Sequence, residues 1–423
     1  MLSNKNISRR QFIKKAALPS LAAVGFPSII QAANRKPTLR IVGTHVTLQE
    51  ALRVRAEQDL GINIEFYPGG SAEVLLKAST NPESFDLYEQ WSNSLKVLWQ
   101  SKAVKGIDVD RLKHWHEINN LTKTGFITQN VKVGAGDAPH KLLYVQPNGS
   151  IGQKQSSHIS FLPYVHNTDS FGYNTDFIPQ GDPYTSESWA SLLNPNYAGK
   201  VAIVNDPTIG LFDLALAAKA RGLMSFNDIG NLSTNEVDQL FEIVIDFKKR
   251  GQFRGVWSSV PQSIDLMARK EVIIQSMFSP AVSALKGQGI PCRFAAPKEG
   301  YRAWHGVMCL SSQVDSERED AAYQYMNWWL SGWPGAFIAR QGYYISNPQR
   351  ARQFMAPSEW DYWYAGKPAS EALKGTDGNI SVLQGDLRSG GAYETRFSNI
   401  AVWNSVMDTY DYTLSKWKEF VWT

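Results

Sequence analysis

The order of apolar and polar positions near the start of the chain predicts a strand, a helix and a second strand. Leu39–Val42 is an apolar run that predicts a strand. Residues 47–50 have the spacing of a capping box, and Gly61 stands where a helix-terminating glycine belongs. Ile62–Phe66 is the next apolar run. Two strands joined by a helix with short links predict a parallel sheet with a right-handed crossover.

The same alternation recurs further along the chain. Lys200–Val204 predicts a strand, and residues 233–236 and 316–319 predict the capped starts of two more helices. Apolar residues at 403, 407, 410, 414, 417 and 421 have helical spacing, so the sequence predicts one amphipathic C-terminal helix that packs on the core. Residues 123–160 and 365–395 lack such periodicity and are predicted to be long surface excursions.

The first residues predict an export signal. Arg9 and Arg10 precede a modest apolar run, and Gln31-Ala32-Ala33 is a small-residue end suited to a signal peptidase. Paired arginines followed by Phe12 are typical of a twin-arginine signal. We therefore expect residues 1–33 to be removed and the protein to be periplasmic.

Removing that segment changes the charge balance. Residues 1–33 contain five of the 43 Lys and Arg and none of the 39 Asp and Glu, so the remainder carries a net charge of about −1. A nucleic-acid partner is not expected, because such binding needs clustered, uncompensated cations. About 390 residues exceed one comfortable core, which predicts two domains.

The sequence leaves the state of its two cysteines open and contains none of four common enzyme motifs. Cys292 and Cys309 are either a disulfide, which an oxidising compartment permits, or two buried thiols. The nucleophile elbow, the phosphate-binding loop, the zinc-protease motif and the dinucleotide fingerprint are all absent. No catalytic residue, metal site or cofactor is predicted.

Four stretches carry a resemblance to a known family. They are Pro163–Val165 with Phe171–Asn174, Ser188–Val201, Pro297–Gly300 with Trp304, and Gly342–Pro348. In this order, after an export signal, they resemble the polyamine (spermidine/putrescine)-binding branch of the periplasmic solute-binding proteins of ABC transporters. The resemblance implies an α/β, two-lobed type II binding-protein fold, with ligand held between lobes that close about a hinge of two crossover segments.

The resemblance also implies domain boundaries. It places lobe 1 at 34–162 with an insert at 123–160, lobe 2 at 163–306, and a return to lobe 1 at 307–345. Residues 346–423 are then a C-terminal extension that includes the final helix. A monomer that binds one solute and presents it to an inner-membrane permease is expected.

The chain departs from the family pattern at the positions that bind ammonium groups. Asp206 matches one acid, but Ile209 and Gly306 stand where two further acids are expected. A buried diamine with one unpaired end would be penalised. The resemblance and the strand ends together predict ligand-binding residues, which are Thr44, His45, Gln90, Trp91, Ser92, Ser170, Asp206, Phe278, Ser279, Trp304 and His305.

These residues favour a small amine-bearing or otherwise polar nitrogenous solute. One acid and several aromatic rings suit a monocation or a zwitterion better than a symmetrical diamine. The alternative is the same fold binding an anionic or ferric-chelate ligand, because Tyr343 and Tyr344 are adjacent phenols. An enzyme is the less favoured interpretation.

Overall fold

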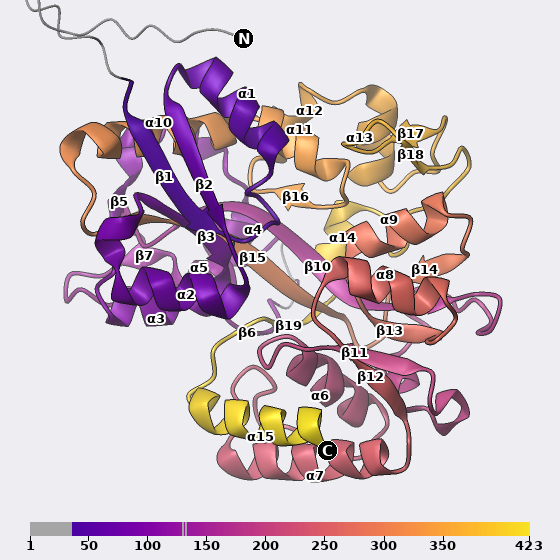
Figure 1. Ribbon diagram of the computed structural model, residues 1–423. Coiled ribbons are helices and arrows are strands. Elements are labelled where there is room, and N and C mark those ends of the chain that lie inside the picture. The colour runs from indigo at the N-terminus through magenta and orange to yellow at the C-terminus, as the bar shows by residue number, and fades with distance from the viewer. Residues whose placement is uncertain (1–35, 129–130, 132) are drawn as a thin grey trace, which may run out of the picture. The chain divides into compact units, whose positions relative to one another are not determined.

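The computed structural model describes residues 36–128, 131 and 133–423 (Figure 1). The predicted export signal at 1–33 lies outside the described residues. Within the described ranges, no helix combines the length and apolarity that a membrane span requires. The compact unit that follows begins at Pro37 and runs to the end of the chain.

The unit mixes helices and strands throughout its length. The strands are β1 (Thr38–Gly43), β2 (Asn63–Pro68), β3 (Leu87–Trp91), β4 (Val104–Lys105), β5 (Ile107–Asp108), β6 (Ala135–Gly136), β7 (Tyr144–Val145), β8 (Ile151–Gly152), β9 (His158–Ile159), β10 (Leu162–Asn174), β11 (Val201–Val204), β12 (Phe253–Trp257), β13 (Ile274–Met277), β14 (Cys292–Phe294), β15 (Tyr301–Ser311), β16 (Tyr344–Ile345), β17 (Leu373–Lys374), β18 (Ile380–Val382) and β19 (Ile400–Trp403). The helices are α1 (Glu50–Leu60), α2 (Ser71–Thr80), α3 (Leu95–Gln100), α4 (Asn120–Thr124), α5 (Pro139–Leu142), α6 (Gly210–Ala220), α7 (Thr234–Lys249), α8 (Val260–Ala268), α9 (Ser279–Gly287), α10 (Ser316–Ser331), α11 (Trp333–Ala339), α12 (Pro348–Arg352), α13 (Pro357–Trp363), α14 (Tyr393–Phe397) and α15 (Tyr410–Trp422).

One large sheet organises these elements. Its main path runs β12-β11-β13-β10-β15-β3-β1-β2, with five short strands paired beside it. β1 pairs in parallel with β2 and with β3, as the strand–helix–strand pattern predicts. Helix α1 ends at Gly61, whose φ of 69° is the left-handed conformation that glycine adopts without a Cβ penalty.

Two long strands, β10 and β15, connect two hydrophobic cores. The first half of β10 pairs antiparallel with β15, and its second half pairs with β13 and β14. Leu162 and Tyr164 accordingly belong to a core that also holds β1, β3 and α10, whereas Phe171 and Tyr173 belong to a core that holds β11, α6 and α7. Every residue of both strands is buried.

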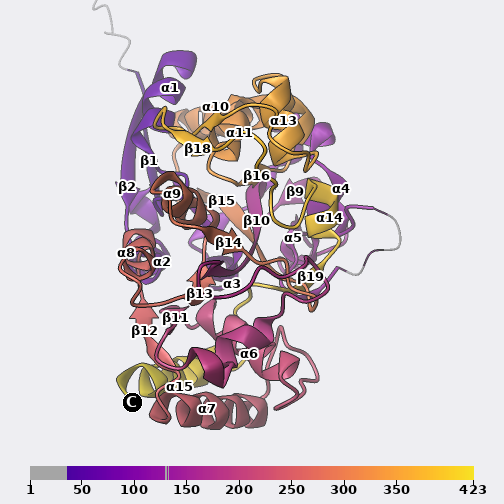
Figure 2. The same cartoon turned by 90° about the vertical axis from the view of Figure 1, so that its right-hand side faces the viewer.

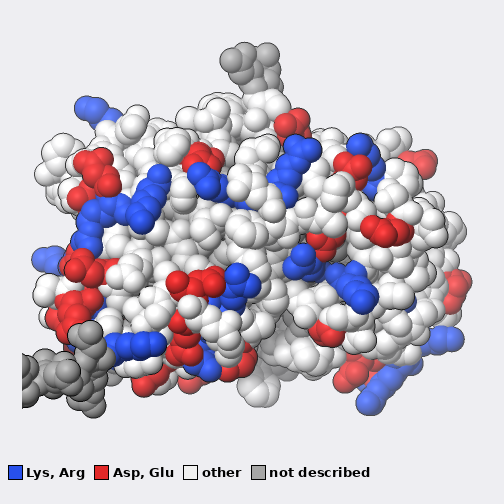
Figure 3. Space-filling view, turned by 90° about the horizontal axis from the view of Figure 1, so that it is seen from above, with Lys and Arg blue, Asp and Glu red and all other residues white. Residues whose placement is uncertain are grey.

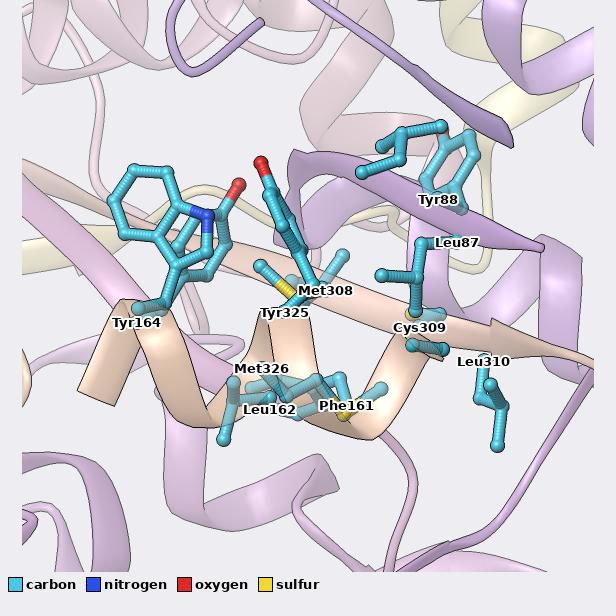
Figure 4. Packing of buried hydrophobic residues seen from close by; sticks show 14 of the residues in the cluster. Leu87, Tyr88, Phe161, Leu162, Tyr164, Met308, Cys309, Leu310, Tyr325 and Met326 are labelled. Carbon is cyan, nitrogen blue, oxygen red and sulfur yellow. The ribbon is translucent and has the colours of Figure 1, made fainter. Parts of the chain in front are cut away.

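Helix α10 covers the first of these cores. Figure 4 shows Tyr325 and Met326 on this helix, beside Met308 of β15 and Tyr164 of β10. The aromatic rings of Tyr164 and Trp329 meet edge to face with centroids 4.9 Å apart. Such tilted contacts add to the free energy of burial.

The second core is closed by the end of the chain. Helix α15 lies along α7 (Figures 1 and 2), and Trp417 packs against Phe241 with ring centroids 6.4 Å apart. The prediction of a single C-terminal helix from residue 403 is wrong, because Trp403 lies in β19 and the helix begins at Tyr410. β19 pairs in parallel with β15, so pairing in the sheet overrides the helical spacing.

The predicted helix starts are correct in one case and displaced in two. Ser233 and Glu236 form the predicted capping box of α7. Helix α1 instead begins after Gln49, and the hydroxyl of Thr47 contacts the hydroxyl of Tyr164 at 3.1 Å. Helix α10 is capped by Asp315, one residue earlier than predicted.

The two segments without periodicity are not simple surface excursions. Within 123–160, Leu143 and Ile159 are fully buried in the first core, and β7, β8 and β9 form a small sheet with β5. Within 365–395, β17 and β18 pair with each other, and Tyr393 of α14 packs in a third hydrophobic cluster. Both segments therefore contribute to the interior.

The two cysteines are free thiols. Cys292 lies in β14 and Cys309 in β15, and both are buried. Of the two states that the sequence allows, the structure shows buried thiols and no disulfide between them.

Charged side chains of both signs are interspersed on the face seen in Figure 3. Pairs four residues apart along α1 follow this arrangement, including Arg53 with Glu57 at 2.8 Å and Arg55 with Asp59 at 2.9 Å. Neighbouring charges of opposite sign neutralise each other locally.

Candidate ligand-binding site

Aromatic side chains and one buried ion pair line a pocket, which we call the aromatic pocket. Its lining residues are Val46, Trp91, Asp169, Ile209, Phe278, Arg302, Trp304, Tyr343 and Asn404. They come from the ends of β1 and β3, from the long strands β10 and β15, from the starts of α6 and α9, and from the segments beside β16 and β19. Loops that follow sheet strands commonly hold ligands in α/β proteins, because the strand ends leave a crevice there.

Four rings form the apolar walls of this pocket. Trp304 and Tyr343 meet edge to face with centroids 5.7 Å apart, and Phe278 is held by Trp257 at 5.3 Å. Trp91 adds a fourth ring, and its indole Nε1 is buried without a hydrogen-bond acceptor. Ring faces of this kind attract organic cations and cover the apolar stem of a small ligand.

A buried charge network forms the polar part of the aromatic pocket. Arg302 Nε donates to Asp213 Oδ1 at 2.7 Å, and Arg302 Nη1 lies 3.7 Å from Asp169 Oδ2 and 3.3 Å from Asn404 Oδ1. Arg302 Nη2 is buried and has no acceptor. Burial raises the pKa of Asp169 to about 7, although Arg302 opposes this rise. The pocket therefore holds the guanidinium of Arg302, with one unpaired N–H donor group, beside the carboxyl group of Asp169. An ammonium group bound next to Asp169 would favour the ionised form of this carboxyl.

Three of the predicted residues line the aromatic pocket, namely Trp91, Phe278 and Trp304. The structure brings these three together from β3, the start of α9 and β15. Thr44 and His45 lie in the turn after β1, and it is Val46, one residue further on, that reaches the lining.

Gln90 and Ser92 flank Trp91 but do not line the pocket. Gln90 is buried and hydrogen-bonds to Ser71 and to the hydroxyl of Tyr88. Ser92 donates to the backbone oxygen of Asn404 at 3.5 Å. Successive residues of a strand point to opposite faces, so Trp91 faces the pocket and Gln90 does not, while Ser92 lies just beyond the end of β3.

Asp206, the predicted ammonium partner, forms a local turn. Its Oδ1 accepts hydrogen bonds from the backbone N–H and the hydroxyl of Thr208, each at 2.7 Å. The acid that lines the pocket is Asp169 instead. Ile209, where the family pattern expects an acid, supplies an apolar part of the lining.

The remaining predicted residues lie away from the lining. The hydroxyl of Ser170 is buried without a partner, and Ser279 accepts a hydrogen bond from Asn167 Nδ2 at 3.2 Å. His305 stacks on Phe161 with ring centroids 5.2 Å apart, and its Nε2 lies 3.2 Å from a backbone oxygen. Burial lowers the pKa of His305 to about 3, so the ring is neutral at physiological pH.

The sequence analysis missed several lining residues, and one of them, Arg302, could have been found from a local pattern. Arg302 lies two residues before Trp304 in β15, so strand alternation places both on one face. Asn404 follows a strand about a hundred residues later, and no local pattern connects it to Arg302. An acid at position 306 is excluded sterically, because a Cβ there would lie 2.5 Å from a methyl group of Val165.

Within the described ranges, no cluster of three or more His, Cys, Asp or Glu residues could hold a metal ion. Tyr344, the second of the adjacent phenols, lies in the third hydrophobic cluster, whereas Tyr343 lines the aromatic pocket.

Comparison with solved structures shows the fold. The chain aligns with the spermidine/putrescine ABC transporter substrate-binding protein PotD of Streptococcus pneumoniae at a TM-score of 0.60 and 13% identity, covering 91% of this chain and 99% of that one. The Tp0655 (TpPotD) lipoprotein of Treponema pallidum aligns at 0.65 and 12%, covering 92% and 100%. The binding protein AgtB of A. tumefaciens R10, in complex with agropinic acid, aligns at 0.57 and 15%, covering 91% and 99%. These likenesses confirm the predicted two-lobed α/β fold.

Comparison of sequences shows the family. A search of curated proteins finds no significant match. The family model described as bacterial extracellular solute-binding protein matches residues 54–360, which is more than half of the chain. The chain belongs to the bacterial extracellular solute-binding proteins.

Proposed function

We propose that this chain is the exported substrate-binding component of an ABC importer and holds one small solute in the aromatic pocket. The family and the fold support a receptor role, and the pocket supplies enclosing rings and a few convergent polar groups, as small-molecule sites do. The protein presents its solute-loaded form to an inner-membrane permease. It acts as a monomeric receptor and not as an enzyme, and it uses no cofactor.

The single observation that carries the ligand class is the pairing of Asp169 with Arg302 in one aromatic pocket. A zwitterion that places its ammonium at Asp169 and its carboxylate at Arg302 Nη2 would satisfy both groups. The four rings would cover the cation and the stem between its charged ends. The solute is therefore a small amine-bearing compound that also carries an acid.

A symmetrical diamine fits this pocket poorly. One of its ammonium groups would pair with Asp169, but the other would meet Arg302, a buried cation of the same sign. Bringing like charges together in a desolvated site is unfavourable. The second candidate is a purely anionic solute, which the unused donor of Arg302 favours.

A thermal-shift screen of the purified protein tests these assignments. The panel contains putrescine, spermidine, α- and ω-amino acids, betaines, agropinic acid, citrate and ferric citrate. A solute at about a hundred times its Kd stabilises the folded state by about 2.7 kcal/mol, which moves the midpoint measurably. A shift with amino acids or agropinic acid supports the zwitterion. A shift with citrate alone would support the anion, and one with spermidine alone would contradict both.

Lobe closure is the motion that we propose for binding. β10 and β15 join the two hydrophobic cores and both contribute to the aromatic pocket, so they are the crossover segments of the hinge. Lobe 1 then contains the first core and lobe 2 the second, with one boundary inside β10, between Val165 and Phe171, and the other inside β15. A ligand favours closure only through contacts made in the closed state. Small-angle scattering with and without the solute found in the thermal-shift screen tests lobe closure. An unchanged radius of gyration would contradict closure.

Export by the twin-arginine route is the remaining part of the proposal. Arg9 and Arg10 supply the arginine pair, and cleavage after Ala33 would leave Asn34 as the first residue. Replacing Arg9 and Arg10 by lysines should keep the protein in the cytoplasm with its leader attached. Fractionation and N-terminal sequencing measure this outcome, and unaffected export of the lysine variant would exclude the twin-arginine route.

A further inference from the structure

A second cavity lies against α9, the end of α13 and residues 381–396. Its lining residues are Ser279, Val282, Ser283, Lys286, Phe294, Tyr362, Trp363, Ser381, Leu387, Arg388, Ser389 and Arg396. We call it the arginine cavity. Its lining includes three cationic side chains and no Asp or Glu.

The two arginines of this cavity are buried without a carboxylate partner. Arg388 and Arg396 are 8% and 1% exposed. Arg388 donates to the backbone oxygens of Trp363 and Gly342, each at 2.7 Å. Arg396 donates to the backbone oxygens of Ser389 and of Thr168. In the described part of the chain, the acceptors that these guanidinium groups reach are all neutral oxygens.

The faces of aromatic rings partly stabilise the two guanidinium charges, but they carry no negative charge. The guanidinium carbon of Arg388 lies 4.5 Å from the ring centroid of Tyr344, and that of Arg396 lies 4.9 Å from the centroid of Tyr301. Lys286, the third cation, has a partner in Asp386 at 3.4 Å. Lys286, Arg388, Arg396 and Asp386 together carry a net charge of +2 beside the cavity, and Asp169 of the aromatic pocket acts on Arg396 from beyond ion-pair distance. A buried charge that meets only dipoles retains most of its desolvation cost.

Two unpaired hydrogen-bond donors lie beside the positive charge of the arginine cavity. The Nε of Arg396 and the Nε1 of Trp363 are buried hydrogen-bond donors without an acceptor, and both residues line the cavity. Buried donors in folded proteins almost always have partners, so each orphaned donor calls for an explanation. An acceptor that enters the cavity would satisfy such groups.

We propose that the arginine cavity binds a small oxyanion that carries a carboxylate or phosphate group. Such an anion would neutralise Arg388 and Arg396 and accept from their planar donor forks. The seryl hydroxyls of the lining would supply further donors. The cavity and the aromatic pocket share no lining residue, although they are neighbours, since Ser279 of the cavity follows Phe278 of the pocket.

Titration calorimetry of the purified protein with inorganic phosphate and with citrate tests the proposal. We expect saturable binding of at least one of them, and the one that binds identifies the group. Lys286→Met removes a cation whose side chain is 32% exposed, so it should fold and should weaken the anion about tenfold. Arg396→Lys keeps the charge but removes the planar fork, and should also weaken binding. Circular dichroism checks that each variant is folded.

Two control variants separate this site from the rest of the molecule. Arg250→Ala removes one cation from an exposed pair on the protein surface, where the side chain is 72% exposed, and should leave anion binding unchanged. Trp304→Ala alters the aromatic pocket alone and should also leave it unchanged. Absence of saturable binding would overturn the proposal. So would anion binding that Trp304→Ala abolishes and Lys286→Met preserves, because the anion would then occupy the aromatic pocket.

Discussion

Arg302 of β15 and Asp213 of α6 form a fully buried ion pair, with Nε and Oδ1 2.7 Å apart. Both side chains are 0% exposed. The pair fixes the guanidinium at the edge of the aromatic pocket while Nη2 stays free for a ligand. A structural ion pair thus orients the group to which we assign ligand recognition.

Asp213→Asn should destabilise the protein by about 3 kcal/mol, because it removes the nearer of the two carboxylates that pair with the buried guanidinium of Arg302 and leaves only Asp169, 3.7 Å away. Urea unfolding measures the free energy. Asp246→Asn breaks an exposed pair with Arg250 and is the matched control, for which we expect a loss of at most about 1 kcal/mol. Equal effects of the two substitutions would contradict the structural role of the buried pair.

Asp169→Asn should weaken solute binding by at least about tenfold, because it removes the one carboxylate that lines the aromatic pocket. Asp206→Asn is the matched control. An asparagine oxygen accepts the same two hydrogen bonds from Thr208, so solute affinity should be unchanged. Calorimetric titration with the solute found by thermal shift measures the affinity of each variant. A larger loss of affinity in Asp206→Asn than in Asp169→Asn would instead identify Asp206 as the ammonium partner.

The stability of the protein should depend on pH through Glu89. Burial raises the pKa of its carboxyl from 4.5 to about 7, and only hydrogen bonds such as that from Tyr164 Oη at 3.2 Å oppose the rise. Between these two pKa values the folded chain binds more protons than the unfolded chain. This contribution to stability is therefore complete below the unfolded pKa and is lost as the pH rises through about 7.

Glu89→Gln should remove that contribution, because the amide does not titrate. The difference in unfolding free energy between about pH 5 and about pH 8 should be smaller in this variant than in the parent. Urea unfolding at both pH values measures it. Glu317→Gln, at an exposed position of α10, is the control and should keep the parent's dependence. An unchanged dependence in Glu89→Gln would show that Glu89 does not titrate in this range.

The thiols of Cys292 and Cys309 should be unreactive in the folded protein. Burial raises the pKa of both thiols, that of Cys292 to about 12, so little thiolate forms at neutral pH. An aromatic disulfide reagent should modify neither thiol under native conditions and both thiols in urea, without a reductant. Titration of fewer than two thiols in urea would contradict the free state of the cysteines.

Trp417→Ala should destabilise the protein by about 3–5 kcal/mol, the usual cost of removing a large buried ring. Trp417 is 3% exposed, and its Nε1 donates to Asn205 Oδ1 at 3.0 Å. Trp422→Ala, at a ring that is 86% exposed on the same helix, is the matched control and should change stability little. A small effect of Trp417→Ala would show that α15 does not contribute to the second core.

Hydrophobic spacing and capping motifs predicted correctly those features that depend on a single helix or strand. The order strand, helix, strand at the start of the chain, the end of that helix at Gly61 and the capping box at Ser233 are as predicted, although the start of the first helix is not. Hydrophobic spacing and cap chemistry act within a few residues. Trp403 shows where such patterns fail, since pairing with β15 draws it into a strand despite its helical spacing.

The sequence by itself determined the family, the α/β class and three rings of the candidate pocket, because ordered motifs and strand ends are visible along the chain. Only the tertiary structure decided which acid faces the pocket, because Asp169 lies in the middle of β10 and Asp206 just after β11, and nothing in the sequence shows what either side chain contacts. Only it could also unite Arg302 with Asp213, or gather Arg388 and Arg396 around one cavity. These groupings depend on long-range packing between segments, which leaves no periodic signal in the chain.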